Sequence, residues 1–237
     1  MKREIVRTIA LRGFAVAVAV VTAWPAPAQD AKAPYPTMAQ LDQYLMSDRN
    51  AEIAMARSAA PESISRDAEV MVLGQHGYET AVQGKNGFVC VVERSWTAGT
   101  DGPDFWNPKL RVPICFNPPA ARSYLPLTLK KTEVILASRS KDQMSEAVKA
   151  AFDRKELRTP ESAMCYMMSK QGYLGDRDGH WHPHLMFFVP QPDAQTWGAN
   201  LPGSPILASE GALDRLAVFL IPVAKWSDGT ADPTDGH

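Results

Sequence analysis

Two strand-rich stretches on either side of a helical middle constrain the fold of this chain more than any other feature. Residues 69–73 (Glu-Val-Met-Val-Leu), 78–83 and 88–94 are short runs rich in apolar and β-branched side chains, separated by glycine-containing turns. The turn at residues 84–87 contains an Asn-Gly pair, which favours the tight turns of hairpins. These runs predict an antiparallel three-strand meander.

The middle of the chain predicts helices. Ser140 and Gln143 form a capping box, and five apolar residues follow at helical spacing, namely Met144, Ala147, Val148, Ala151 and Phe152. Residues 120–137 predict another helix, in which Pro126 either lies in the first turn or causes a kink. Further strands are expected at residues 163–174, 180–189 and 213–223. The predicted fold class is α+β, a mainly antiparallel sheet with helices packed on it.

The remaining segments predict short helices and long loops. A capping box at Thr37 and Gln40 predicts a helix over residues 37–45, and a second short helix is expected to begin at Asp48. Residues 95–119 contain five prolines and residues 190–205 are similarly rich in turn formers, so both predict ordered loops. We expect a single α+β domain at 37–230. It should be preceded by a mobile leader at 29–36 and followed by a disordered tail at 231–237.

Residues 1–28 have the pattern of a secretory signal peptide. Four basic residues precede an apolar run of eleven residues, and Ala26-Pro27-Ala28 provides small residues at a cleavage site. Eleven apolar residues are too few to span a bilayer, which argues against the alternative of an uncleaved anchor. The sequence therefore predicts export to the periplasm or the medium, without membrane association after cleavage.

The charge of the chain excludes one class of partner. Removal of residues 1–28 leaves 21 basic and 25 acidic residues, a net charge of −4. A mildly acidic chain without a basic cluster in its sequence lacks the electrostatic signature of a nucleic-acid-binding protein. A small molecule is the partner that we expect.

The three cysteines predict one disulfide. Cys90 lies in a strand-like run and Cys115 follows the proline-rich segment. A bridge between them is permitted by export and would close a loop of about 25 residues, worth about 3–4 kcal/mol in the chain-entropy model. Cys165 is then the odd thiol, either buried and inert or a soft metal ligand.

Alternating histidines in residues 179–189 are the main candidate site. In a strand, the Cα atoms of His182 and His184 would be about 6.6 Å apart on one face, so both imidazoles could reach one ion. His180 and His184 would be about 13 Å apart, too far to share an ion unless Pro183 bends the chain. We predict His182 and His184 as the metal pair, with His180 or, from elsewhere in the chain, the histidine at position 76 as a third ligand.

Further candidate ligands of this site are His76, Glu79, Asp176, Asp178 and Cys165. Zinc suits histidine with carboxylate and is favoured. Copper is second, because thioethers suit Cu(I) and several methionines lie close in sequence, although core filling is their ordinary role. The alternative interpretation is that the histidines are structural or exposed and bind no metal.

Two functions follow from these patterns. The first is an exported metal-binding protein, which would be a metal-dependent hydrolase if an open coordination position activates water. The second is a non-catalytic periplasmic binding or interaction domain, with an apolar pocket formed by loops around Trp96, Trp106 and Trp197. The sequence contains no Gly-x-Ser-x-Gly, His-Glu-x-x-His, Walker or dinucleotide-binding motif, so whether the protein is an enzyme stays open.

Four segments carry a resemblance to other proteins, namely residues 86–96, 179–188, 197–205 and 222–229. Together they resemble an uncharacterised group of exported bacterial proteins over about residues 58–229. The resemblance implies export, and no fold, ligand or functional residue is attached to it.

Overall fold

The computed structural model describes residues 34–97, 100, 102–176, 181–190, 194–211, 213 and 215–233. In these residues eight strands form one sheet, in the order β2-β1-β3-β4-β5-β6-β8-β7. The strands are β1 (Glu69–Gly74), β2 (Gly77–Val82), β3 (Val89–Glu93), β4 (Val112–Phe116), β5 (Ala163–Met167), β6 (His184–Pro190), β7 (Leu207–Gly211) and β8 (Leu216–Pro222). Neighbouring strands are antiparallel except β1 and β3, which confirms the α+β class with a mainly antiparallel sheet.

The first three strands lie where the sequence predicts them, but they do not form a simple meander. β1 is in the middle, with β2 antiparallel on one side and β3 parallel on the other. The segment between β2 and β3 passes across the beginning of β1, where the backbone amide of Lys85 donates to the carbonyl of Asp67 (2.8 Å). A Cβ on Gly84 would lie 2.2 Å from the backbone nitrogen of Glu69, so this crossing needs glycine. The Asn86-Gly87 turn belongs to the crossing and not to a hairpin.

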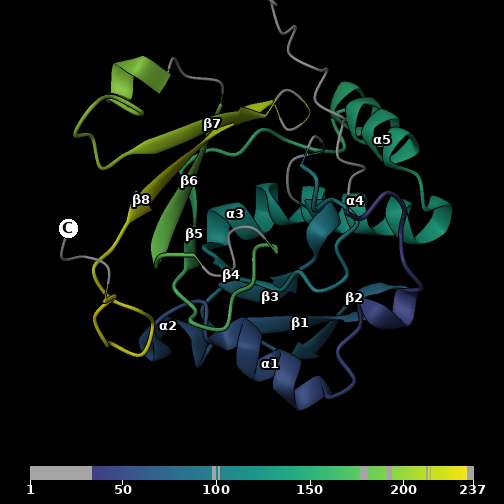
Figure 1. Ribbon diagram of the computed structural model, residues 1–237, viewed down its shortest axis with the longest axis horizontal. Helices are drawn as coiled ribbons and strands as arrows, with labels where there is room; N and C mark the ends of the chain where they lie inside the picture. The colour runs from purple at the N-terminus through teal and green to yellow at the C-terminus, as the bar shows by residue number, and fades with distance from the viewer. Residues whose placement is uncertain are drawn as a thin grey trace, which may run out of the picture. The chain divides into compact units, whose positions relative to one another are not determined.

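Helices cover both faces of the β1–β4 part of the sheet (Figure 1). The helices are α1 (Arg49–Arg57), α2 (Glu62–Ser65), α3 (Pro118–Ser123), α4 (Leu125–Ser138) and α5 (Lys141–Asp153). Three short 3-10 turns are η1 (Leu41–Gln43), η2 (Ser95–Thr97) and η3 (Ala194–Trp197), of which η3 lies beside β8. The side chains on one face of these strands pack against α1, namely Val70, Cys90, Val92 and Cys115. The side chains on the opposite face join the larger core below α3–α5, namely Val89, Val91, Ile114 and Phe116. Alternation of apolar side chains on both faces explains why β3 and β4 are buried throughout.

The helix signals in the sequence have the expected effects at three positions. Asp48 caps α1 by accepting from the amides of Asn50 and Ala51, and Ser140 caps α5 by accepting from that of Gln143. Pro126 lies in the first turn of α4, which resolves the two alternatives for this residue. The segment at 37–45 is an exception, because only the single turn η1 forms there.

Two strands appear where the sequence predicts none: β4 lies within the predicted loop at 95–119, and β7 lies between the predicted loop at 190–205 and the predicted strand at 213–223. β4 contains Pro113, which a central strand normally excludes. Pro113 pairs with Val92 of β3, two positions from Cys115, whose Cα lies only 4.0 Å from that of Cys90. Such close pairs are the non-hydrogen-bonded ones of an antiparallel ladder, and they alternate, so β3 needs no N–H from Pro113. Its nitrogen faces the side of β5, whose ladder with β4 includes only Cys115 and Phe116. β7 is an edge strand with few buried side chains and has little apolar signal in its sequence.

The predicted disulfide is present. Cys90 and Cys115 lie directly opposite each other on β3 and β4, with their Cα atoms 4.0 Å apart, and both are fully buried below α1. Cys165 on β5 is the free cysteine, and burial raises the pKa of its thiol well above the usual range. Its thiol is therefore neutral and enclosed in the core.

The ends of the domain extend beyond the predicted boundaries. Tyr35, assigned to the leader, packs against the core and donates its hydroxyl proton to Asp176. Ala231 pairs with Lys225 and Asp232 is buried, so residues 231–233 belong to the fold although the sequence predicts a tail from 231. The signal peptide at 1–28 lies outside the described residues. None of the described helices has the length and hydrophobicity needed to cross a membrane.

Candidate functional site

A cavity of about 680 Å³ lies between the segment that precedes β6 and the segment that follows β8. Two tryptophans, Trp181 and Trp226, contribute from the two segments, and both are otherwise buried. The remaining lining is mixed in polarity and includes Lys170, His182, Thr230, Ala231, Asp232 and Pro233. The volume is that of a pocket for a small molecule.

His182 presents its imidazole at this cavity. Its Nδ1 lies 2.7 Å from Oδ2 of Asp232, a carboxylate whose side chain is only 4% exposed, whereas the imidazole is 64% exposed. Because a carboxylate accepts, Nδ1 carries the hydrogen, and in the neutral ring Nε2 is then the basic nitrogen. A buried carboxylate therefore fixes the tautomer and the orientation of an exposed imidazole.

Asp232 is held in place by the short hairpin that follows β8. The amide of Trp226 donates to the carbonyl of Thr230 (2.9 Å), and the amide of Asp232 donates to the carbonyl of Ala224 (3.0 Å). The amide of Ser227 donates to the carbonyl of Met168 (2.9 Å), which attaches the hairpin to the end of β5. These bonds place a residue near the C-terminus of the chain beside a histidine 50 positions earlier.

Trp181 is fixed by three neighbours. Its Nε1 donates to the carbonyl of Ser169 (2.9 Å), and its ring meets the His184 imidazole edge-on, with the ring centroids 5.8 Å apart. Gly172 lies against the other part of the indole, where a Cβ would be 2.4 Å from Cζ2. One wall of the cavity is therefore rigid.

Lys170 and Asp228 close one side of the cavity with an exposed ion pair (2.7 Å). Lys170, together with the hydroxyl and amide of Thr230, lowers the pKa of the Asp228 carboxyl. The Thr230 hydroxyl donates its proton to Asp228 (2.6 Å), so this hydroxyl is engaged in the turn.

His184 is the first residue of β6 and lies below the cavity. Its Nδ1 donates to the carbonyl of His182 (2.6 Å), and its side chain is buried. Burial lowers the pKa of this imidazole. The hydrogen bond to the carbonyl of His182 raises the pKa and offsets part of that shift. His184 therefore supports the backbone of His182 as a neutral ring.

The two-residue repeat expected for the histidines does not extend to His182. β6 begins at His184, after Pro183, and the side chain of His182 turns outwards to Asp232 while that of His184 turns inwards to Trp181. His182 and His184 therefore do not lie on one face of an extended strand, as expected from the sequence. His180 lies outside the described residues.

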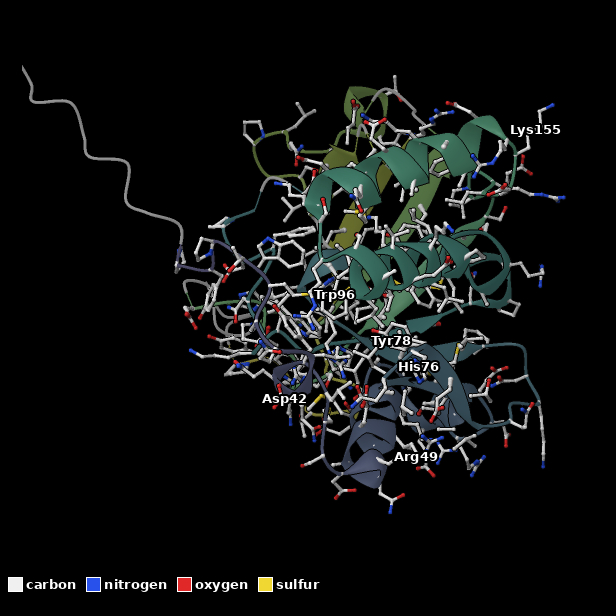
Figure 2. All side chains as sticks on the ribbon, turned by 90° about the vertical axis from the view of Figure 1, so that its right-hand side faces the viewer. Asp42, Arg49, His76, Tyr78, Trp96 and Lys155 are labelled. Carbon is white, nitrogen blue, oxygen red and sulfur yellow. A yellow bond between two sulfur atoms is a disulfide. The ribbon has the colours of Figure 1, made fainter. Side chains whose placement is uncertain are left out.

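The remaining predicted ligands are dispersed. His76 is exposed in the turn between β1 and β2 (Figure 2), and three strands separate β1 from β6, a distance of roughly 19 Å. Glu79 pairs with Arg49, and Asp176 accepts from Tyr35, Tyr173 and Lys109, which lower the pKa of the Asp176 carboxyl to about 2, with Tyr173 contributing most. Asp178 is not among the described residues. Within the described chain, no three His, Cys, Asp or Glu side chains gather closely enough to hold a metal ion, and the metal site stays a prediction.

The three tryptophans expected to form an apolar pocket do not meet. Trp96 is fully buried and donates from Nε1 to Oγ1 of Thr132 (3.0 Å), beside α4 (Figure 2). Trp106 packs in the same core, whereas Trp197 stacks on Phe219 in a separate cluster, with the ring centroids 4.8 Å apart. The pocket is built from other tryptophans, Trp181 and Trp226.

We expect Gly172→Ala to disturb this cavity. The new methyl group would overlap the Trp181 indole, which is held by its hydrogen bond to Ser169 and its contact with His184, so the free energy of unfolding should fall by about 1–3 kcal/mol. Chemical denaturation measures this loss. Gly74→Ala is the matched control, because its Cβ would meet only ordinary contacts at 3.5 Å or more. Equal stability of the two variants would contradict the tight packing of Trp181.

Sequence reasoning missed Asp232 and the role of Trp226. The sequence pattern places Asp232 in a tail, because a single acidic residue near a terminus carries no signal of burial. Trp226 lies in one of the segments that carry the resemblance, residues 222–229, which was the available pointer to it. Comparison of the chain with protein families, with curated proteins and with solved structures finds no match.

Proposed function

We propose that this is an exported protein that binds a small aromatic molecule in the cavity between Trp181 and Trp226. The observation that carries the proposal is the exposed His182 imidazole, held by buried Asp232 at the edge of an indole-walled cavity. Apolar walls with a few oriented polar groups are the usual composition of a small-molecule site. The indoles would stack on the ligand, and Nε2 of His182 would accept a hydrogen bond from it.

Binding fits this geometry better than covalent catalysis. Among the described residues that line the cavity, the hydroxyl group is that of Thr230, and its proton is engaged by Asp228. A nucleophile activated by the imidazole would need to lie within hydrogen-bond reach of Nε2. His182 is therefore proposed as the polar contact that selects ligands with a donor group.

Export is part of the proposal. The buried disulfide supports it, because such bridges form and persist in oxidising compartments. The signal-like pattern of residues 1–28 is the other support.

Titration calorimetry with two probes of equal shape tests the binding role. We expect 1-naphthol, which has a hydroxyl donor, to bind the mature protein more tightly than naphthalene. His182→Ala should weaken 1-naphthol about fivefold, the effect of one neutral hydrogen bond, and leave naphthalene unchanged. Trp226→Ala should weaken both probes about tenfold or more, because each loses a stacked indole.

Trp197→Ala is the matched control, since Trp197 is 50% exposed and lies outside the cavity. The absence of saturable binding of either probe, or equal losses in the Trp197 and Trp226 variants, would refute the proposal. Asp232→Asn should reproduce part of the His182 effect by releasing the imidazole.

A metal-binding role for His182 is the second candidate function. Imidazoles that bind metals commonly donate their other ring N–H to a carboxylate, which is the arrangement of His182 and Asp232. Zinc is favoured over copper on the chemistry of the ligands. Metal analysis of protein purified without a histidine tag tests this role. A metal content well below one ion per chain that is unchanged in His182→Ala would refute metal binding by His182, and with it the metal-dependent hydrolase.

A further inference from the structure

A second cavity, of about 840 Å³, lies between α3, the end of α5 and the segment that follows it. Four basic residues line it, Arg122 on α3, Lys155 and Arg158 after α5, and Arg215 before β8. We call it the basic cavity. Glu161 is the acidic residue in the lining, so the wall carries an excess of three positive charges in a chain whose net charge is −1.

Three of these cations are uncompensated. No ion pair of Arg122, Lys155 or Arg158 is present within the described residues, whereas Arg215 pairs with Asp153 (2.6 Å). The C-terminal carbonyls of α5 would attract Lys155, which follows the helix directly, but not Arg122, which lies on α3. Like charges that face one cavity repel each other, and a bound anion would relieve that repulsion.

The backbone at two of the basic residues is also unusual. Lys155 has φ 61° and Arg215 has φ 53°, in the left-handed region that residues with a side chain rarely adopt. After a helix such as α5, glycine is the usual residue at this position. Lysine and arginine occupy these two strained positions, and both direct a cation to the same cavity.

The cavity has an apolar floor beside its cationic wall. Phe152 and Leu157 are largely buried below it, and the Arg215 guanidinium lies over the Phe152 ring, 5.3 Å from its centroid. We propose that the basic cavity binds a small organic phosphate ester, with its phosphate on the arginines and its organic part on this floor. Guanidinium groups match phosphate oxygens in pairs, and a phosphate ester carries close to two negative charges at neutral pH.

This site is separate from the cavity at His182. Arg215 precedes β8 and Trp226 follows it, so the seven residues of the strand keep the two cavities roughly 20 Å apart. The inference therefore does not rest on the aromatic-ligand proposal.

Titration of the mature protein with phenyl phosphate tests the inference. We expect one saturable site, weakened about tenfold by Arg122→Gln and by Arg158→Gln, each of which removes a charge-assisted contact. Inorganic phosphate should bind more weakly because it lacks the organic part, and benzyl alcohol should not bind. Lys149→Gln on α5 is the matched control, since Lys149 is exposed and pairs with Glu146 away from the cavity.

Lys155→Gly separates a binding role from a structural one. Glycine relieves the left-handed backbone, so the variant should unfold at the same or a higher temperature while binding phenyl phosphate more weakly. Equal affinity in the wild type and in all three cavity variants overturns the inference, as does the absence of binding at millimolar phenyl phosphate. Binding only to vesicles that contain phosphatidylglycerol also overturns it, because the partner would then be a lipid surface.

Discussion

Glu52→Leu should destabilise the protein by roughly 3–5 kcal/mol, because it leaves the Arg94 guanidinium buried without its counter-charge. The pair joins α1 to the end of β3 at 2.7 Å, and its side chains are only 2% and 0% exposed. Glu52 also accepts from the amide of Leu73 (3.2 Å), so its loss leaves a backbone donor in the core as well. Urea denaturation gives the change in the free energy of unfolding.

The exposed pair between Arg49 and Glu79 is the matched control. It too connects α1 to the sheet, but its side chains are 50% and 59% exposed. Glu79→Leu should cost less than about 1 kcal/mol, since water solvates the remaining Arg49. Similar losses in the two variants would mean that burial is not what makes the Glu52–Arg94 pair important.

A double variant shows how much of the effect comes from the isolated charge. Arg94→Met in the Glu52→Leu background should recover part of the stability, because a buried pair can often be replaced by apolar side chains. Recovery should be incomplete, since Arg94 also donates to the carbonyls of Tyr44 (2.7 Å) and Val92. A double variant less stable than the single one would contradict this account.

Short sequence signals predict helices and strands correctly where the contacts that form the element lie within the same stretch of chain. Ser140 caps α5 through its own first turn, and the apolar run at 88–94 contains β3, whose five side chains are all buried on one face or the other. The class of the fold follows from such elements taken together.

Signals that depend on distant contacts failed. Pro113 looks incompatible with a central strand until its nitrogen is seen to face away from β3, beyond the β4–β5 ladder. Gly84 looks like a hairpin residue until it is seen against Glu69. The parallel pairing of β1 with β3 depends on the passage of the β2–β3 segment across the beginning of β1, and no short sequence pattern indicates that passage.

The candidate site shows the same limit. His182 was identified from its own sequence neighbourhood, but the geometry assumed for it required an unbroken strand, whereas Pro183 precedes the start of β6. Its partner Asp232 is 50 positions away and is positioned by the hairpin after β8. Composition and spacing identify the histidine as a candidate, and only tertiary contacts fix the tautomer and the orientation of its imidazole.

Removal of the disulfide is the second change with a large expected effect. In the double variant Cys90→Ala/Cys115→Ala, a loop whose ends are 25 residues apart is no longer closed in the unfolded chain, which should cost about 3–4 kcal/mol of stability. The cysteines join β3 to β4 directly below α1, so the loss of two sulfur atoms also leaves space in that core. Denaturation of the oxidised wild type and of the variant measures the sum.

Cys165→Ala is the control, because Cys165 is equally buried but closes no loop. We expect it to cost only about 1 kcal/mol, the effect of a small cavity. Dithiothreitol should leave the folded wild type oxidised and reduce it once denaturant is added, since both sulfur atoms belong to fully buried residues and thiolate attack needs access to them. Rapid reduction of the native protein would show that the disulfide is not enclosed in the sheet. Equal losses of stability in the Cys165 variant and the double variant would show that the bridge does not stabilise the protein by constraining the unfolded chain.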